Sequence, residues 1–239
     1  MKKTIILTVG LIFAPLIFSA QKNKLSIEAT YARIFADNSR DDQVIYFGSQ
    51  GTEYGSAYSA LTGYHFMQGF TAIAGYSFNR YDDLSENTSS ITKNLRKLTY
   101  HLIQTGIRKD FEFNLDLAIR FSALFLYMPP LEYRYATIDR KSSSAISETV
   151  ESYNETIGFK LVADLKYSFS ENLYLTVGVS LVQLVTNNEN LEIKTTFAGN
   201  TTTKPVIDRN NLTIATSPYR SLDLSDLRIE AGMGYEFEI

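Results

Sequence analysis

The chain has 239 residues, no cysteine and a formal net charge of −3 at pH 7. This length suits one domain, and the lack of cysteine excludes a disulfide framework, a thiolate metal site and a lipoprotein anchor. The charge gives no sign of the basic patch that nucleic-acid binding requires, so no nucleic-acid partner is predicted.

The start of the chain has the pattern of an export signal. Two lysines, an apolar run over 5–18 and the small pair Ser19-Ala20 predict a cleaved signal peptide over 1–20. The alternative, a membrane anchor, is disfavoured because the apolar run is too short to span a bilayer as a helix. The mature domain is therefore predicted to cover 21–239.

The mature chain alternates apolar and polar residues over a series of stretches. They lie at about 24–35, 56–66, 70–81, 98–111, 113–127, 155–169, 173–186 and 227–239. Since side chains of a strand alternate between faces, each stretch predicts a strand with one apolar face. The connections between them alternate long and short, which is typical of barrels with short periplasmic turns and long outer loops. We predict an all-β, eight-stranded, antiparallel, up-and-down transmembrane β-barrel with both termini periplasmic.

The fourth stretch has two competing apolar sets. Ile103 and Ile107 alternate with Leu98 and Leu102. In the other strands the glycines fall on the more polar face, and if Gly106 does the same, Ile103 and Ile107 point outward. This orientation is the one we predict.

Two features concern the connections and the chain end. Pro129-Pro130 is predicted to end the fifth strand, because proline cannot donate to the ladder. The last connection carries alternating pieces at 191–197 and 211–216, which we expect to extend strands seven and eight as a hairpin beyond the membrane. The strand at 227–239 should pair on both edges and close the barrel, since a free apolar edge invites aggregation.

Alternation alone does not separate a membrane barrel from a soluble lipocalin-like barrel, in which the apolar face points inward. Aromatic residues near the short turns favour the membrane, as an interfacial girdle. They are Tyr64, Phe66, Phe70, Phe111, Phe113, Tyr167, Phe169, Tyr235 and Phe237. The opposite face carries charges of both signs, which can pair inside a lumen and act as a structural plug. These are Glu28, Arg108, Asp116, Arg120, Lys160, Asp164, Lys166, Arg228, Glu230 and Glu236. For Arg120 and Lys160 we expect pairs between strands five and six.

The strand spacing, the loop asymmetry and the terminal strand 232–239 resemble small outer-membrane barrels of the OmpA transmembrane domain and OmpX type. The start at Ser19-Ala20-Gln21 also resembles the outer-membrane β-barrel family of Bacteroidota. The resemblance implies the outer membrane of a Gram-negative bacterium, contact with its lipid and reading of the last strand by the barrel-assembly machinery. That strand departs from the family by ending in Ile239 and not in Phe.

Catalytic chemistry is not predicted. The barrel enzymes that deacylate lipid A use a His-x-Ser pair, whereas Phe66-Met67 follows His65 and Leu102-Ile103 follows His101. The loop at 48–51 lacks the Gly-Lys-Ser/Thr of a phosphate loop, and the acidic loop at 37–42 lacks calcium-loop spacing. We therefore predict no catalytic residue, no metal and no cofactor.

The function predicted from the sequence is structural or interactive. Eight strands enclose an interior that side chains about fill, and loops carry function on rigid scaffolds. We expect a barrel that presents extracellular loops or docks on a larger envelope complex. The alternative is narrow transport of ions or small hydrophobic molecules, and a lipid-modifying enzyme is the weakest hypothesis.

Overall fold

The computed structural model describes residues 24–36, 44–46, 54–83, 92–114, 116–139, 145–187, 191–197, 200–206 and 221–239. The predicted signal peptide, Leu115 and the piece at 211–216 lie outside this part of the chain and remain predictions. Among the described residues, no helix has the length and apolar character needed to cross a bilayer.

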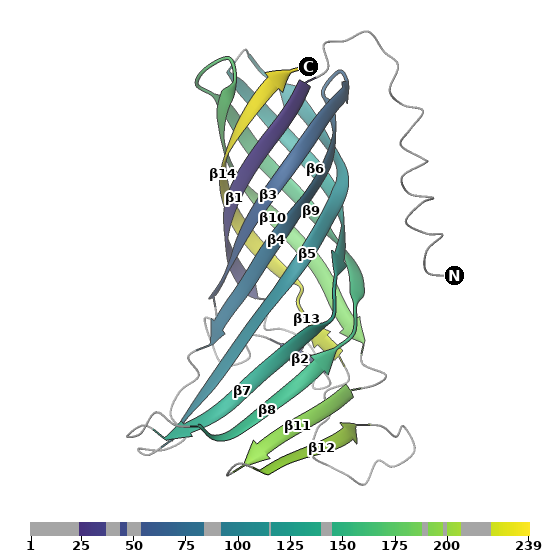
Figure 1. Cartoon of the computed structure of the whole chain (residues 1–239). Coiled ribbons are helices and arrows are strands. Elements are labelled where there is room, and N and C mark those ends of the chain that lie inside the picture. Colours follow the sequence, from purple (N-terminus) through teal and green to yellow (C-terminus); the bar gives the residue numbers. More distant parts are fainter. Residues whose placement is uncertain are drawn as a thin grey trace, which may run out of the picture.

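Eight long strands form a closed barrel (Figure 1). They are β1 (Lys24–Ala36), β3 (Tyr54–Met67), β4 (Phe70–Asp83), β5 (Thr92–Glu112), β6 (Leu117–Met128), β9 (Thr156–Ser168), β10 (Leu173–Asn187) and β14 (Asp226–Glu238). Each pairs antiparallel with the next, in the order β1-β3-β4-β5-β6-β9-β10-β14. The predicted eight-stranded antiparallel barrel is confirmed.

The last strand closes the barrel. β14 pairs with β1 from Lys24↔Glu238 to Ala36↔Asp226, and its other edge pairs with β10. Both of its edges are therefore satisfied, as a strand with an apolar face requires. β1 begins and β14 ends at the same end of the barrel as the short turns (Figure 1).

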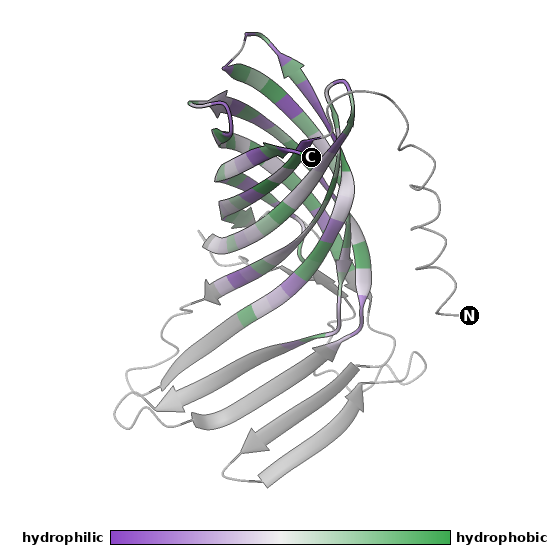
Figure 2. Ribbon diagram, turned by 45° about the horizontal axis from the view of Figure 1, so that its top comes forward, coloured by the Kyte–Doolittle hydropathy of each residue, from purple (hydrophilic) through white to green (hydrophobic). Residues whose placement is uncertain are grey.

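The strands alternate between the outer wall and the interior, and Figure 2 shows the same alternation in hydropathy. In β5, Ile103 is 53% exposed and Ile107 is 42% exposed, whereas Leu98 and Leu102 are almost fully buried. The orientation predicted from Gly106 is therefore confirmed. A Cβ at Gly106 would overlap the carbonyl of Ala123 on the neighbouring β6, so this position has no room for a side chain.

The long connections contain further strands, of which only the one at 191–197 was predicted from the alternation. These are β2 (Val44–Tyr46), β7 (Leu131–Asp139), β8 (Ala145–Tyr153), β11 (Leu191–Phe197), β12 (Asn200–Val206) and β13 (Ser221–Asp223). β5 extends past the barrel and pairs with β7, and pairing continues through β8 and β11 to β12. Figure 1 shows this loop-end sheet below the barrel.

The expected extension of strands seven and eight by residues 191–197 is wrong. β11 pairs with β8 on one edge and with β12 on the other. The physical reason is that the β7–β8 hairpin presents an edge of unpaired N–H and C=O groups, and β11 satisfies it. β10 instead pairs briefly with β13, which pairs in parallel with β2.

Candidate functional site

The centre of the barrel interior is built around Glu28 on β1. Its carboxylate accepts hydrogen bonds from Arg108 Nη1 at 3.2 Å, from Arg120 Nη1 at 2.9 Å and from the Tyr174 hydroxyl at 3.1 Å. Arg120 Nη2 adds a contact of 3.3 Å to the second carboxylate oxygen. All four side chains are buried, so one carboxylate lies between two guanidinium groups in a site shielded from water.

Arg120 also forms the cross-strand pair expected between strands five and six. It lies directly opposite Asp164 in the β6–β9 register, and its Nε donates to Asp164 Oδ1 at 2.5 Å. Arg108 Nε donates to Ser122 Oγ at 3.3 Å. The two arginines thereby join β1, β5, β6 and β9 across the lumen.

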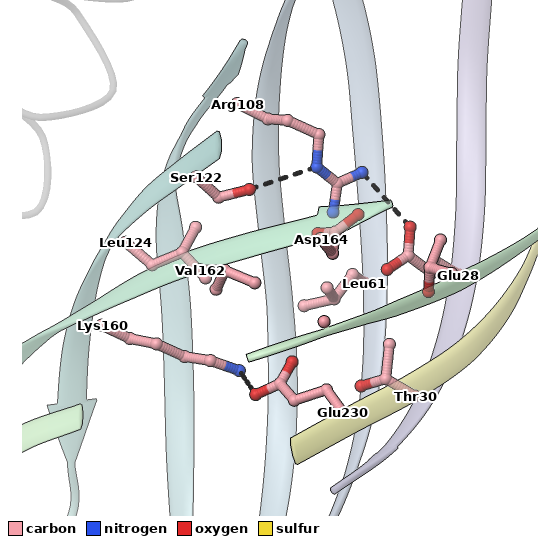
Figure 3. Close-up of a pocket in the computed structure, with 12 residues that line it drawn as sticks. Glu28, Thr30, Leu61, Arg108, Ser122, Leu124, Lys160, Val162, Asp164 and Glu230 are labelled. Carbon is pink, nitrogen blue, oxygen red and sulfur yellow. Dashed lines mark hydrogen bonds and ion pairs between the residues drawn. The ribbon is translucent and has the colours of Figure 1, made fainter. Parts of the chain in front are cut away.

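Lys160 pairs differently from the prediction. Its Nζ lies 2.5 Å from Glu230 Oε1 on β14, two strands away, and Ser180 Oγ on the intervening β10 donates to the same oxygen at 2.5 Å. Figure 3 shows this pair beside the group of Glu28 and Arg108. The cavity between them has a volume of only about 20 Å³, enough for about one water molecule.

A third group lies near the short turns. Lys166 forms an ion pair with Glu236, whose carboxylate is 4.0 Å from His65 Nε2. His65 Nδ1 shares a hydrogen bond of 2.9 Å with Thr71 Oγ1. His65 therefore lies inside the barrel, beside the polar side chains of Thr71 and Glu236.

The other half of the interior, toward the loop end, is mainly apolar in the described part of the chain and contains a buried ion pair. Arg228 donates to both carboxylate oxygens of Asp226, at 2.5 and 2.9 Å, and also to Asn79 and Tyr100. Tyr81 donates to Asp226 at 2.9 Å. Buried apolar residues surround this pair; they include Ile34, Leu98, Leu102, Leu126, Met128, Val182 and Leu184. The interior is thus filled by ion pairs in one half and by an apolar cluster in the other.

Asp116 is the exception among the predicted lumen charges. It is exposed in the turn before β6. Asn114 Oδ1 accepts the backbone N–H groups of Asp116 and Leu117, at 2.9 and 2.7 Å, and this turn delays the start of the strand to Leu117. The placement of Asp116 in the lumen is therefore wrong.

Two inward acids were not predicted from the sequence. Asp110 shares the face of Arg108 on β5, lies opposite Arg120 in register, and has a buried Oδ1 with no hydrogen-bond partner among the described residues. Its spacing of two from Arg108 was the available signal. Asp226 was missed because the last strand was taken to begin at residue 227.

The predicted aromatic girdle lies at the strand ends next to the short turns. Phe111 and Phe113 are more than half exposed, and Phe111 makes an edge contact with Phe121 at 6.0 Å between centroids. The rings of Phe66 and Phe70 are 6.4 Å apart across their turn, and those of Tyr235 and Phe237 are 6.2 Å apart. Tyr64, Tyr167 and Phe169 complete the set on the same outer wall. Their role at a membrane interface remains a proposal.

His101 lies on the outer wall, stacked on Tyr76 at 5.7 Å and hydrogen-bonded through Nδ1 to the Tyr76 hydroxyl. No group of three or more metal-ligating side chains occurs among the described residues.

No protein-family model matches the sequence, and no curated protein matches it. The fold is similar to a major outer membrane protein from Thermus thermophilus, with a TM-score of 0.54 and 13% identity over 91% of this chain and 100% of that one. Neisserial surface protein A gives a TM-score of 0.46 and 13% identity over 92% and 100% of the two chains. The N-terminal β-barrel domain of Pseudomonas aeruginosa OprF gives 0.45 and 14% over 90% and 98%.

At 13% sequence identity, the likeness to the Thermus protein establishes the fold alone. It supports the resemblance to small outer-membrane barrels at the level of architecture, and the link to Bacteroidota remains a prediction.

Proposed function

We propose that this chain is an integral β-barrel of a bacterial outer membrane. The observation that carries the proposal is an apolar outer wall around a charged interior. Phe121, Leu161 and Val177 are each about half exposed on the wall, while Arg120 and Glu28 behind it are buried and paired. Contiguous apolar surface of this kind marks a membrane or partner interface. We propose that the short turns and both termini lie on the periplasmic side of the membrane, since outer-membrane barrels have short periplasmic turns.

Within that membrane the chain acts as a structural or interaction protein. The filled interior leaves no open passage among the described residues, since the cavity at its centre holds about one water. The loop-end sheet of β5, β7, β8, β11 and β12 extends beyond the barrel and presents a surface on a rigid base (Figure 1). We propose that this sheet meets an external ligand or a larger envelope complex, and that the barrel-assembly machinery inserts the chain through β14.

The test is a pull-down of the tagged full chain from native outer membrane in mild detergent. A companion in stoichiometric amount is expected with the wild type. The matched control replaces residues 191–206 by a short Gly-Ser linker, which removes β11 and β12 and should release the companion. Absence of any stoichiometric companion would contradict docking on a complex.

Ion transport is the second candidate, favoured by the ion pairs that line the central cavity. Its test is planar-bilayer conductance of the refolded barrel. A steady conductance that ends when Arg120 and Lys160 are both replaced by Gln would favour transport over the structural role.

A further inference from the structure

The barrel wall has a break between β5 and the β6–β7 segment. The β5–β6 ladder ends at Ile103↔Tyr127, and the β5–β7 ladder resumes only at Lys97↔Arg134. Residues 98–102 of β5 remain paired with β4 on their other edge. The six residues 128–133 face these five residues across the break without ladder pairing.

Two prolines in the sequence explain the break. Pro129 and Pro130 lie between β6 and β7, and neither can donate a backbone hydrogen bond across the gap. On the other side of the same segment the ladder is interrupted only at the two prolines, because Met128 pairs with Thr156 and Leu131 pairs with Tyr153. The interruption is therefore longer on the β5 side, where five residues of β5 lack a partner on this edge.

A notch with a volume of about 420 Å³ occupies this break. This volume is within the range of small-molecule sites, roughly 300–1,000 Å³. The residues that line it are Thr99, Tyr100, His101, Pro129, Pro130, Leu131 and Glu132. Pro130, His101 and Glu132 are exposed, so the notch opens to the outer surface.

The two sides of the notch differ in chemistry. Its inner wall is formed by Leu131 and Tyr100, both buried members of the apolar cluster of the loop-end half, and the Tyr100 hydroxyl accepts a hydrogen bond from the buried Arg228. Its rim carries the polar groups of Thr99, His101 and Glu132. An apolar floor beneath a polar rim suits a ligand that has one apolar chain and a polar head.

The outer wall beside the notch is apolar. Ile103, Tyr127 and Ile157 are all exposed there, and Tyr127 pairs with Ile103 and with Ile157 in the adjoining ladders. A ligand dissolved in the membrane would therefore reach the notch sideways along this wall. The size of the notch fits one chain better than the two chains of a phospholipid.

We propose that the notch between β5 and β6–β7 is a lateral binding site for a single-chain amphiphile, such as a long-chain fatty acid, taken from the membrane. This inference depends on one part of the proposed function, namely that the wall around the notch faces lipid.

The experiment uses the fact that the chain has no tryptophan, so one introduced tryptophan reports alone. Thr99→Trp on the rim is reconstituted in phospholipid vesicles and titrated with a dibrominated stearic acid, which quenches a tryptophan that it touches. Quenching is expected to saturate at a low mole fraction and to be reversed by unbrominated stearic acid.

Two filling variants test the place of binding. Leu131→Phe adds a ring to the inner wall, and Pro130→Phe covers the exposed mouth in case the first variant does not fold. In the Thr99→Trp background each should raise the half-saturating mole fraction about tenfold, because an overfilled pocket loses its fit.

The control is Val177→Trp on β10, an exposed wall position. It should be quenched by the fatty acid without saturation and by a dibrominated phospholipid as well. Quenching at residue 99 that is equally unsaturable would overturn the site, and equally strong saturable quenching there by the phospholipid would overturn the single-chain ligand. No quenching at residue 177 would instead contradict a lipid-facing wall, which is a failure of the proposed function.

Discussion

Glu28 illustrates how single residues hold this barrel together. Removing an ion from water costs several kcal/mol, and only close opposite charges with good hydrogen bonds offset that cost. Glu28 has two guanidinium partners and a phenol, so each side chain of the group depends on the same carboxylate. Loss of that carboxylate would leave Arg108 without its ionic partner in the described lumen.

We predict that Glu28→Gln lowers the free energy of unfolding by about 3–5 kcal/mol, the usual cost of breaking a buried ion pair from one side. The measurement is urea unfolding of the barrel refolded in lipid vesicles. The same substitution at the exposed turn residue Glu171 should change the value by less than about 0.5 kcal/mol. Equal effects at the two positions would show that the central ion pairs do not stabilise the fold.

For single residues, the sequence predicted correctly which strand face most side chains occupy, but it predicted only some of the ion-pair partners. The period of two assigned Arg120, Asp164 and Glu230 to one side because strand geometry leaves no other choice. The partner of Lys160 was not predictable, since it lies on β14 beyond β10 and depends on the stagger of the barrel. The prediction for Asp116 was wrong because the Asn114 side chain accepts backbone N–H groups in the turn and so decides where the strand begins.

The loop-end sheet shows that the position of a strand and the choice of its neighbour are determined by different factors. The barrel strands follow from local alternation, and the turn at Gly69 has the positive φ of 69° that glycine tolerates best. β11 also alternates, yet its partner is β8, an element of a different connection. Alternation identifies a strand without naming its neighbour, and for this reason the pairing beyond the barrel could not be predicted.

We predict that replacing residues 191–206 by a short Gly-Ser linker leaves the barrel folded. Ladder pairing connects β11 and β12 to each other and to β8, and to no barrel strand in the described part of the chain. The urea midpoint and the heat-dependent shift in gel mobility should match those of the wild type.

The comparison variant is a truncation that removes β14. β1 and β10 both lose their partner, so this variant should not fold into a closed barrel. A chain that fails to fold without β11 and β12, or that folds without β14, would contradict the assignment of these elements.

For the whole molecule, the filled interior predicts an absence of steady conductance. Ion pairs close the half near the short turns, and the apolar cluster with Arg228 closes the half near the loops. Planar bilayers that contain the refolded wild type should show no long-lived current steps. Reproducible steps of constant size would show that the ion pairs open, and would favour the transport hypothesis.

We propose that lipid, and not water, touches the outer wall. An arginine near the bilayer midplane of a barrel costs about 2–4 kcal/mol, and much less near the interface. Val177 points outward within β10, and Asn172 lies in the adjoining short turn.

The most direct measurement is the free energy of unfolding in lipid vesicles for Val177→Arg, compared with Asn172→Arg. A lipid-facing wall predicts a loss of about 2–4 kcal/mol for the first and at most about 1 kcal/mol for the second. A Val177→Arg barrel as stable as the wild type, monomeric and soluble without detergent, would show that water touches this wall.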